Sequence, residues 1–205
     1  MFEGCKSLRN IPSLSMINNQ NWNNGPSVFY VKAFNKCYVV DEITNIPVNT
    51  THTWVNGNQF NTTFASCMRA KEITFATWNG TPYDVYWKNQ TIDLTNVGNA
   101  AGFETYMTDY NSGITADKAV SDYGSYELLK NDPDWFASSI SFSRYNHTSA
   151  VNTINSLPNC ISPDGTNIIK FSGEHGSSTD GGAINTLTAE EIAVATAKGW
   201  TVSFA

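Results

Sequence analysis

Charged side chains are scarce in this sequence of 205 residues, of which only 15% are Asp, Glu, Lys or Arg. The 12 basic residues form no cluster, and the 18 acidic residues leave a formal net charge of -6. A protein that neutralises nucleic-acid phosphates needs a basic patch, so we expect no nucleic-acid partner. The same shortage speaks against binding to anionic membrane surfaces. Uncharged polar groups must therefore supply most of the surface.

Long apolar runs are missing as well. No segment approaches the roughly 18 consecutive apolar residues that are needed to cross a bilayer, so we expect no membrane insertion. The N-terminus has neither the basic region nor the apolar core of a secretion signal. We therefore expect no signal peptide within the given residues.

Catalytic motifs are equally hard to find. Gly-x-Ser-x-Gly, Gly-x-Gly-x-x-Gly and the phosphate-loop pattern do not occur. The sequence has three histidines, of which His147 is expected to have a structural role at a helix start; the second is His52. The third, His175, lies near Glu174 and Asp180 in a Gly-rich loop, where the three could bind a metal or act as acid and base, but their spacing matches no metal signature. We therefore expect that the protein is not an enzyme and that it has neither a cofactor nor a metal site.

A repeated motif is the main feature that the sequence does contain. Phe-x-x-Cys occurs three times, each time followed at fixed offsets by apolar residues: Phe2 and Cys5, Phe34 and Cys37, Phe64 and Cys67. The copies stand about 30 residues apart, a period typical of solenoids. Each unit of such a protein is a helix or turn plus a strand, and it becomes stable only when stacked on its neighbours. The sequence therefore predicts a repeat protein.

The predicted solenoid uses the whole length, residues 1–205, as a single domain, because about six such units fill the chain. Its first residues already belong to a repeat motif without a capping element, so we expect the sequence to be a C-terminal fragment of a longer chain. An exposed solenoid end could pair with a second copy and form a homodimer. Residues 78–134 depart from the repeat and are predicted to be an irregular insertion. Insertions of this kind often lie on the binding face.

Periodicity and turn residues predict the local structure. Helices are expected at 116–130, at 150–157 before Pro158, and after a capping box of Thr188 and Glu191, where Ile192 and Ala193 should face inward and Gly199 should end the helix. Strands are expected at residues 43–46, 73–77, 83–87, 91–94, 138–143, 167–171 and 200–204.

The four cysteines favour free thiols over disulfides or a metal site. Three of them, Cys5, Cys37 and Cys67, take the same place in successive repeats, where a small apolar side chain faces the core. Paired Cys-x-x-Cys motifs and a suitable Cys/His cluster do not occur. The fourth, Cys160, follows Pro158 and Asn159 and is expected in a loop.

Residues 1–12, Met-Phe-Glu-Gly-Cys-Lys-Ser-Leu-Arg-Asn-Ile-Pro, resemble the repeat of the BspA-like leucine-rich-repeat proteins. Residues 187–202 look like the terminal unit of many such proteins from gut bacteria and their phages. The resemblance implies an α/β repeat fold, a leucine-rich-repeat solenoid of short parallel strands with helices or turns on the other side. It also implies attachment or recognition of a host or cell-surface protein at a cell surface, outside the cell or in a virion, without catalytic residues.

Aromatic residues suggest an alternative ligand. Trp54, Trp78 and Trp87 lie in or beside Asn/Thr/Gly-rich segments, where an exposed indole could stack on a sugar ring while amides bind its hydroxyl groups. Aromatic side chains also fill irregular corners of solenoids, and Trp200 is expected in the core. An adhesive protein-binding module is thus the main hypothesis, and a glycan-binding module or a structural part of a phage particle are the alternatives.

Overall fold

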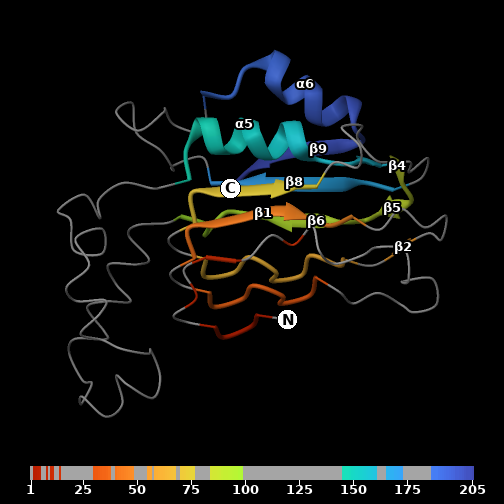
Figure 1. Cartoon of the computed structure of the whole chain (residues 1–205). Coiled ribbons are helices and arrows are strands. Elements are labelled where there is room, and N and C mark those ends of the chain that lie inside the picture. Colours follow the sequence, from red (N-terminus) through yellow and green to blue (C-terminus); the bar gives the residue numbers. More distant parts are fainter. Residues whose placement is uncertain are drawn as a thin grey trace, which may run out of the picture.

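Successive turns of the chain stack on one another in the protein, and we call each stacked turn a coil. The red N-terminal coil and the blue C-terminal coil lie at opposite ends of this stack (Figure 1). Side-chain hydrogen bonds between neighbouring coils in the N-terminal part join residues that are 29 to 35 positions apart in sequence. The computed structural model describes residues 2–5, 8, 10–11, 14, 30–37, 40–48, 55–56, 58–67, 70–76, 84–98, 145–160, 165–172 and 186–205.

Two of the coils are joined by strands β1 (Glu42–Ile46) and β3 (Glu72–Phe75). The strands run parallel, and Ile43 lies directly beside Ile73. Both isoleucines are fully buried. Alternate side chains of a strand point to opposite faces, and these two point to the inner face. The buried row of these strands therefore forms part of a core that runs from coil to coil.

All the other paired strands are parallel too. One sheet contains three of them in the order β6-β8-β9, namely β6 (Thr91–Asp93), β8 (Asn167–Phe171) and β9 (Trp200–Phe204). Two shorter pairs join β2 (Val55–Asn56) to β5 (Trp87–Lys88), and β4 (Asp84–Val85) to β7 (Asn159–Cys160).

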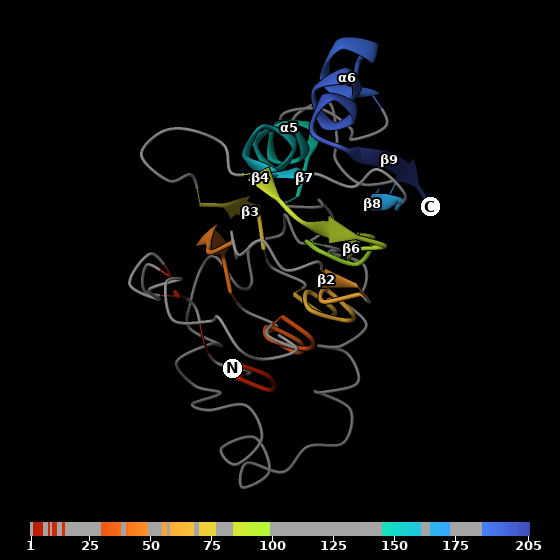
Figure 2. The same cartoon turned by 90° about the vertical axis from the view of Figure 1, so that its right-hand side faces the viewer.

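Two helices lie beside the strands in the C-terminal half, α5 (His147–Ser156) and α6 (Ala189–Ala197). Figure 2 shows α5 above β3 and α6 next to β9. The hydroxyl of Thr153 donates to the carbonyl of Ile73 over 2.6 Å, and the hydroxyl of Ser156 accepts from the main-chain N–H of Phe75 over 3.0 Å. Helix α5 thus covers the edge of β3 that β1 leaves open.

A tight turn recurs at every copy of the Phe-x-x-Cys motif. In the first copy the main-chain N–H of Cys5 donates to the carbonyl of Phe2 over 3.0 Å, and the next two copies repeat this bond. The residue before each cysteine has a left-handed backbone, with φ of 74° at Gly4, 61° at Lys36 and 64° at Ser66. The backbone repeats along with the motif, even where a side chain makes this conformation costly.

The main-chain hydrogen bond of this turn occurs once more, between Leu94 and Val97, although the residue before Val97 does not have a left-handed backbone. The main-chain N–H of Val97 donates to the carbonyl of Leu94 over 3.1 Å, and both side chains are buried. Strand β6 just before this turn pairs with β8. Residues 84–98 therefore belong to the stack, and the predicted irregular insertion over residues 78–134 is wrong for this part; the rest of that range lies outside the described residues.

The repeated phenylalanines form a column of stacked rings. The centroids of Phe2 and Phe34 lie 5.7 Å apart, and those of Phe34 and Phe64 lie 6.0 Å apart, with nearly parallel planes. A second stack joins Tyr30 to Phe60 over 5.1 Å. Burial is nearly complete inside the column, where Phe34 is 3% and Phe64 is 1% exposed.

Several local predictions are confirmed and two are wrong. Strands 167–171 and 200–204 and the capping box of α6 form as predicted. Ala193 does not face inward, because Ala195 is the buried residue of α6 and Ala193 is exposed. Cys160 is not in a loop but in β7. The predicted helix at 116–130 and strand at 138–143 lie outside the described residues.

Gly98 lies where two parts of the chain approach closely. It has a φ of 62°, and a Cβ atom at this position would come within 2.6 Å of the carbonyl oxygen of Ala70 and within 2.6 Å of the main-chain nitrogen of Tyr145. Gly98 therefore lies directly beside Tyr145 near the start of α5, although 46 residues separate the two in sequence (residues 99–144). Only glycine fits at this junction.

We expect Phe64→Ala to lower the free energy of unfolding by about 3–5 kcal/mol, the usual cost of removing a buried aromatic side chain. Denaturant unfolding followed by circular dichroism measures this change. Phe2→Ala serves as the matched control and should cost clearly less, because Phe2 lies at the partly exposed end of the same column. Equal losses in the two variants would contradict the stacked column.

We expect Gly98→Ala to destabilise the protein more than Gly4→Ala. Both glycines have a left-handed backbone, for which a Cβ atom costs about 1–2 kcal/mol. Only at position 98 would the new methyl group also collide with the backbone, since nothing lies within 4 Å of a Cβ at position 4. Thermal unfolding of the two variants compares these costs, and a Gly4→Ala variant that is the less stable of the two would contradict the close approach at Gly98.

Candidate interaction surface

The three-stranded sheet turns one row of side chains from each strand toward the surface. We call this surface the sheet face. Its members alternate along their strands with the buried residues Ile92 and Ile169. Pairing aligns them in two rows across the sheet: Thr91, Ile168 and Thr201, and Asp93, Lys170 and Ser203.

Hydroxyl groups, one cation and one anion make up most of the sheet face. The carboxylate of Asp93 accepts hydrogen bonds from the hydroxyl and the main-chain N–H of Thr95, over 2.6 Å and 3.1 Å, so it is held by its own turn. No ion pair or hydrogen bond involves the Lys170 ammonium in the part of the chain that the structure describes. The sheet face can therefore donate hydrogen bonds to a partner and offer it one positive charge.

Side-chain amides fix the ends of the strands that carry the sheet face. The amide oxygen of Asn58 accepts from the main-chain N–H of Thr91 over 3.1 Å. The amide oxygen of Gln90 accepts from the N–H of Gln59 over 2.8 Å, and that of Asn167 accepts from the N–H of Gln90 over 3.0 Å. These bonds tie three consecutive coils together, and no pattern in the sequence identified them.

The pair of strands β1 and β3 carries a more acidic surface. Register places Glu42 beside Glu72, and the ammonium of Lys71 lies 3.1 Å from the carboxylate of Glu42. Both members of this ion pair are about half exposed, so it contributes little to stability. The outward surface thus changes in charge between the N-terminal strand pair and the sheet face.

Trp87 does not offer a ring to a ligand. It is 2% exposed and packs edge-on against Phe60, with ring centroids 5.4 Å apart. The prediction that Trp87 stacks on a sugar from the surface is therefore wrong, while Trp54 and Trp78 lie outside the described residues. Trp200 is in the core as predicted, and its indole N–H donates to the carbonyl of Pro158 over 3.0 Å.

Two of the three repeat cysteines, Cys37 and Cys67, line the core as free thiols. The thiol of Cys37 donates to the carbonyl of Phe2 over 3.1 Å, and that of Cys67 donates to the carbonyl of Phe34 over 3.3 Å. Burial raises the pKa of Cys37 to about 12 and that of Cys67 well above its usual value, so both stay protonated and unreactive. Cys5 is exposed, and its predicted place in the core is wrong.

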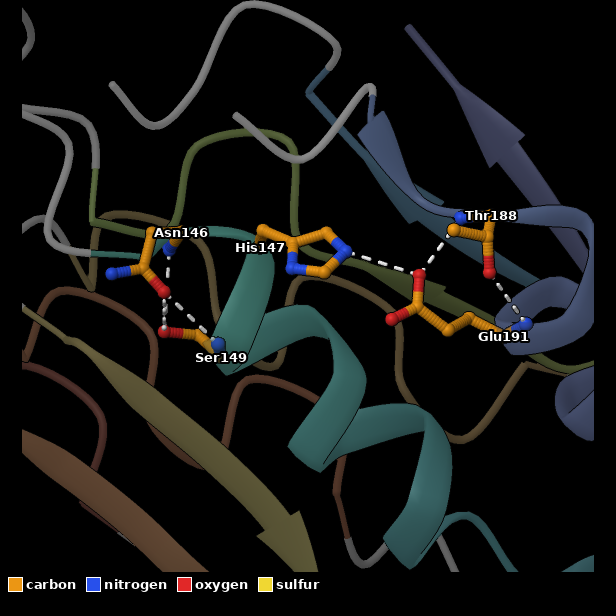
Figure 3. A network of polar contacts seen from close by, with 5 residues as sticks. All are labelled: Asn146, His147, Ser149, Thr188 and Glu191. Carbon is orange, nitrogen blue, oxygen red and sulfur yellow. Dashed lines mark hydrogen bonds and ion pairs between the residues drawn. The ribbon is translucent and has the colours of Figure 1, made fainter. Parts of the chain in front are cut away.

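His147 and Glu191 connect the two helices at their N-termini (Figure 3). His147 is the first residue of α5, and its Nε2 atom lies 3.0 Å from Oε2 of Glu191 in the first turn of α6. The same carboxylate oxygen accepts from the main-chain N–H of Thr188 over 2.8 Å. The hydrogen bond from the N–H of Thr188 is the main cause that lowers the pKa of Glu191, and the contact with His147 lowers it further. The contact between His147 and Glu191 thus links the N-terminal cap of α5 to that of α6.

No described residue meets His147 in a way that would make it a catalytic base for a nucleophile. The hydroxyl of Ser149, two residues away, is held by the side chain of Asn146 within the cap of α5. His52, and the predicted group of Glu174, His175 and Asp180, lie outside the described residues. Within the described residues, no three His, Cys, Asp or Glu side chains are placed to hold a metal ion.

No family model matches this sequence, and no curated protein or solved structure matches it either. Among the described residues, no helix is long and apolar enough to cross a membrane.

We expect the protein to lose stability in acid partly through Glu191. A carboxyl group whose pKa is lowered by folding stabilises the folded state at neutral pH, and this contribution disappears as the pH falls through the folded-state pKa. Glu191→Gln keeps a hydrogen-bonding side chain for the capping box but removes the charge. It should lower the free energy of unfolding at neutral pH by about 0.5–1 kcal/mol and flatten the loss on acidification.

Chemical denaturation at a series of pH values measures both effects. Glu190→Gln is the matched control, because it removes the same charge from the neighbouring exposed residue in the same helical turn. An acid dependence that is equal in both variants would contradict a specific role of the contact between His147 and Glu191.

Proposed function

We propose that this chain is a non-enzymatic recognition module of the leucine-rich-repeat type, a solenoid that binds a protein on a host or cell surface. The proposal places it at a cell surface, outside the cell or in a virion. It rests first on the stacking of parallel strands from successive coils. The repeated Phe-x-x-Cys turn and the resemblance of residues 1–12 to a leucine-rich repeat give the same indication.

The sheet face is the observation that carries the proposal. Strands from three coils hold its side chains in two registered rows, so their positions are fixed by main-chain hydrogen bonds before a partner arrives. A preorganised surface loses less conformational entropy on binding than a flexible one. The face combines hydroxyl groups, the ammonium of Lys170 and the partly exposed Ile168, which is the mixed composition typical of non-obligate protein interfaces.

A protein ligand is favoured over a glycan because of the aromatic residues. Glycan recognition by stacking needs an exposed ring, and the ring of Trp87 is buried. Within the described residues the only large apolar side chain that is classed as exposed is Phe204, at the end of β9. The sheet face itself carries hydrogen-bonding groups and no aromatic ring.

The test is a binding screen of the purified chain against extracellular-matrix and host cell-surface proteins, with a glycan array alongside. We expect saturable binding to a protein. Lys170→Glu and Thr201→Arg should each weaken it by at least about tenfold, which corresponds to 1.4 kcal/mol. Ala193→Arg is the matched control, since it adds a charge to an exposed position of α6 away from the sheet face.

Two results would contradict the proposal. Binding to glycans alone would replace it with a carbohydrate-recognition function. Protein binding that is equally strong in all variants would show that another surface is used.

A further inference from the structure

Strand β9 is the last strand of the three-stranded sheet, and only one of its two edges is paired. All five of its residues are in register with β8. The main-chain N–H of Ala205 donates to the carbonyl of Phe171 over 2.9 Å. Since alternate residues of a strand point their main-chain groups to the same side, Thr201 and Ser203 also face β8. The N–H and C=O groups of Val202 and Phe204 therefore point to the opposite edge, away from β8.

Nothing in the described part of the chain pairs with this outer edge. On the inner side of β9, Val202 and Phe204 are also less covered than their register partners Ile169 and Phe171, whereas Trp200 is buried. Phe171 is fully buried, whereas Phe204, its neighbour in register, is 42% exposed. The centroids of the two rings lie 6.4 Å apart. The core therefore continues to β9 and is left partly open there.

Edge strands of natural proteins usually carry a feature that prevents pairing with another chain, such as a lysine, a proline or a bulge. Strand β9, with the sequence Trp-Thr-Val-Ser-Phe, has neither a charged residue nor a proline. Its pairing with β8 is regular over all five residues, without a bulge. The edge is thus open to a further strand.

We propose that two copies of this chain associate through the outer edges of their β9 strands, which pair in an antiparallel manner around a two-fold axis at Val202. This interface is separate from the sheet face and does not depend on the proposed function. A two-fold axis at Val202 pairs it with its own copy and places Trp200 opposite Phe204 of the second copy. These three residues are the ones whose main-chain groups face outward, so every available group finds a partner.

Self-pairing also suits the side chains. The axis stands perpendicular to the sheet, so both copies keep Val202 and Phe204 on the same side, where they extend one apolar row across the interface. The strand is uncharged, so no like charges meet when it pairs with itself. Burial of the exposed part of Phe204 would add to the main-chain hydrogen bonds.

The experiment is sedimentation equilibrium of the full 205-residue chain over about a hundredfold range of concentration, because a dimer dissociates on dilution by mass action. We expect a monomer–dimer equilibrium. Val202→Pro removes an N–H that faces outward and should spare the bonds to β8, while Phe204→Lys places a charge at the edge. Each should raise the dimer dissociation constant by at least about tenfold.

Thr201→Lys is the matched control, because it adds the same charge to the same strand on the sheet face, and it should leave the dimer unchanged. Circular dichroism verifies that each variant is folded, and Phe204→Lys provides the test if the proline variant is not. A wild-type chain that stays monomeric at every concentration overturns the proposal. A dimer that persists in folded Phe204→Lys, or that is lost equally in Thr201→Lys, overturns it as well.

Discussion

Main-chain hydrogen bonding between successive coils is the constraint on which the rest of the structure depends. The N–H groups of Phe2 and Gly4 donate to the carbonyls of Ala33 and Asn35 in the next coil, over 2.7 and 2.8 Å. Further along the chain the N–H of Leu94 donates in the same way to the carbonyl of Lys170. A coil too short to pair its own polar groups must satisfy them with its neighbours, because burying them unpaired is costly. The stacked phenylalanines and thiols are a consequence, since equivalent side chains come to lie above one another.

This dependence also explains why unfavourable backbone conformations are tolerated. Left-handed φ values of 57° at Lys32 and 53° at Thr62 occur at equivalent places in two consecutive coils, and non-glycine residues normally avoid them. The N–H of Lys32 donates to the carbonyl of Asn61 over 3.1 Å, which fixes this part of the turn against the next coil. The hydrogen bonds between coils determine the backbone, and the side chains at these positions adapt to it.

The sequence predicted those features that have a local sequence signature. The Phe-x-x-Cys turns, strand 167–171 and the capping box of α6 could all be found because each has a local signature. The turn at Leu94 and Val97 was missed, because residues of similar apolar character replace phenylalanine and cysteine and conceal the motif, although the main-chain hydrogen bond of the turn is kept.

The sheet face and the hydrogen bonds of the Asn167 side-chain amide could not be predicted in this way. Asn167 is bonded to Gln90 and to Trp87, residues that are 77 and 80 positions away in sequence. Their contact depends on the register between distant strands, and a single sequence does not contain this information. Cys160 shows the same limit, because its place in β7 follows from pairing with Val85 and not from the proline that precedes it.

The C-terminal coil is closed on its helical side and open on its strand side. Helix α6 satisfies its first N–H groups with its own capping box, and Glu191 fixes it to α5 through His147. Lys198 adds hydrogen bonds from its ammonium to the carbonyls of Ile154 and Asn155 at the end of α5. The outer edge of strand β9 has no comparable cover among the described residues, and Phe204, the last residue of the strand, is exposed. The helix is already capped, whereas a second chain that added to the strand side would gain main-chain hydrogen bonds and bury the exposed part of Phe204. Among the described residues, the two halves of this coil thus differ in the number of polar and apolar groups that are still left to be covered.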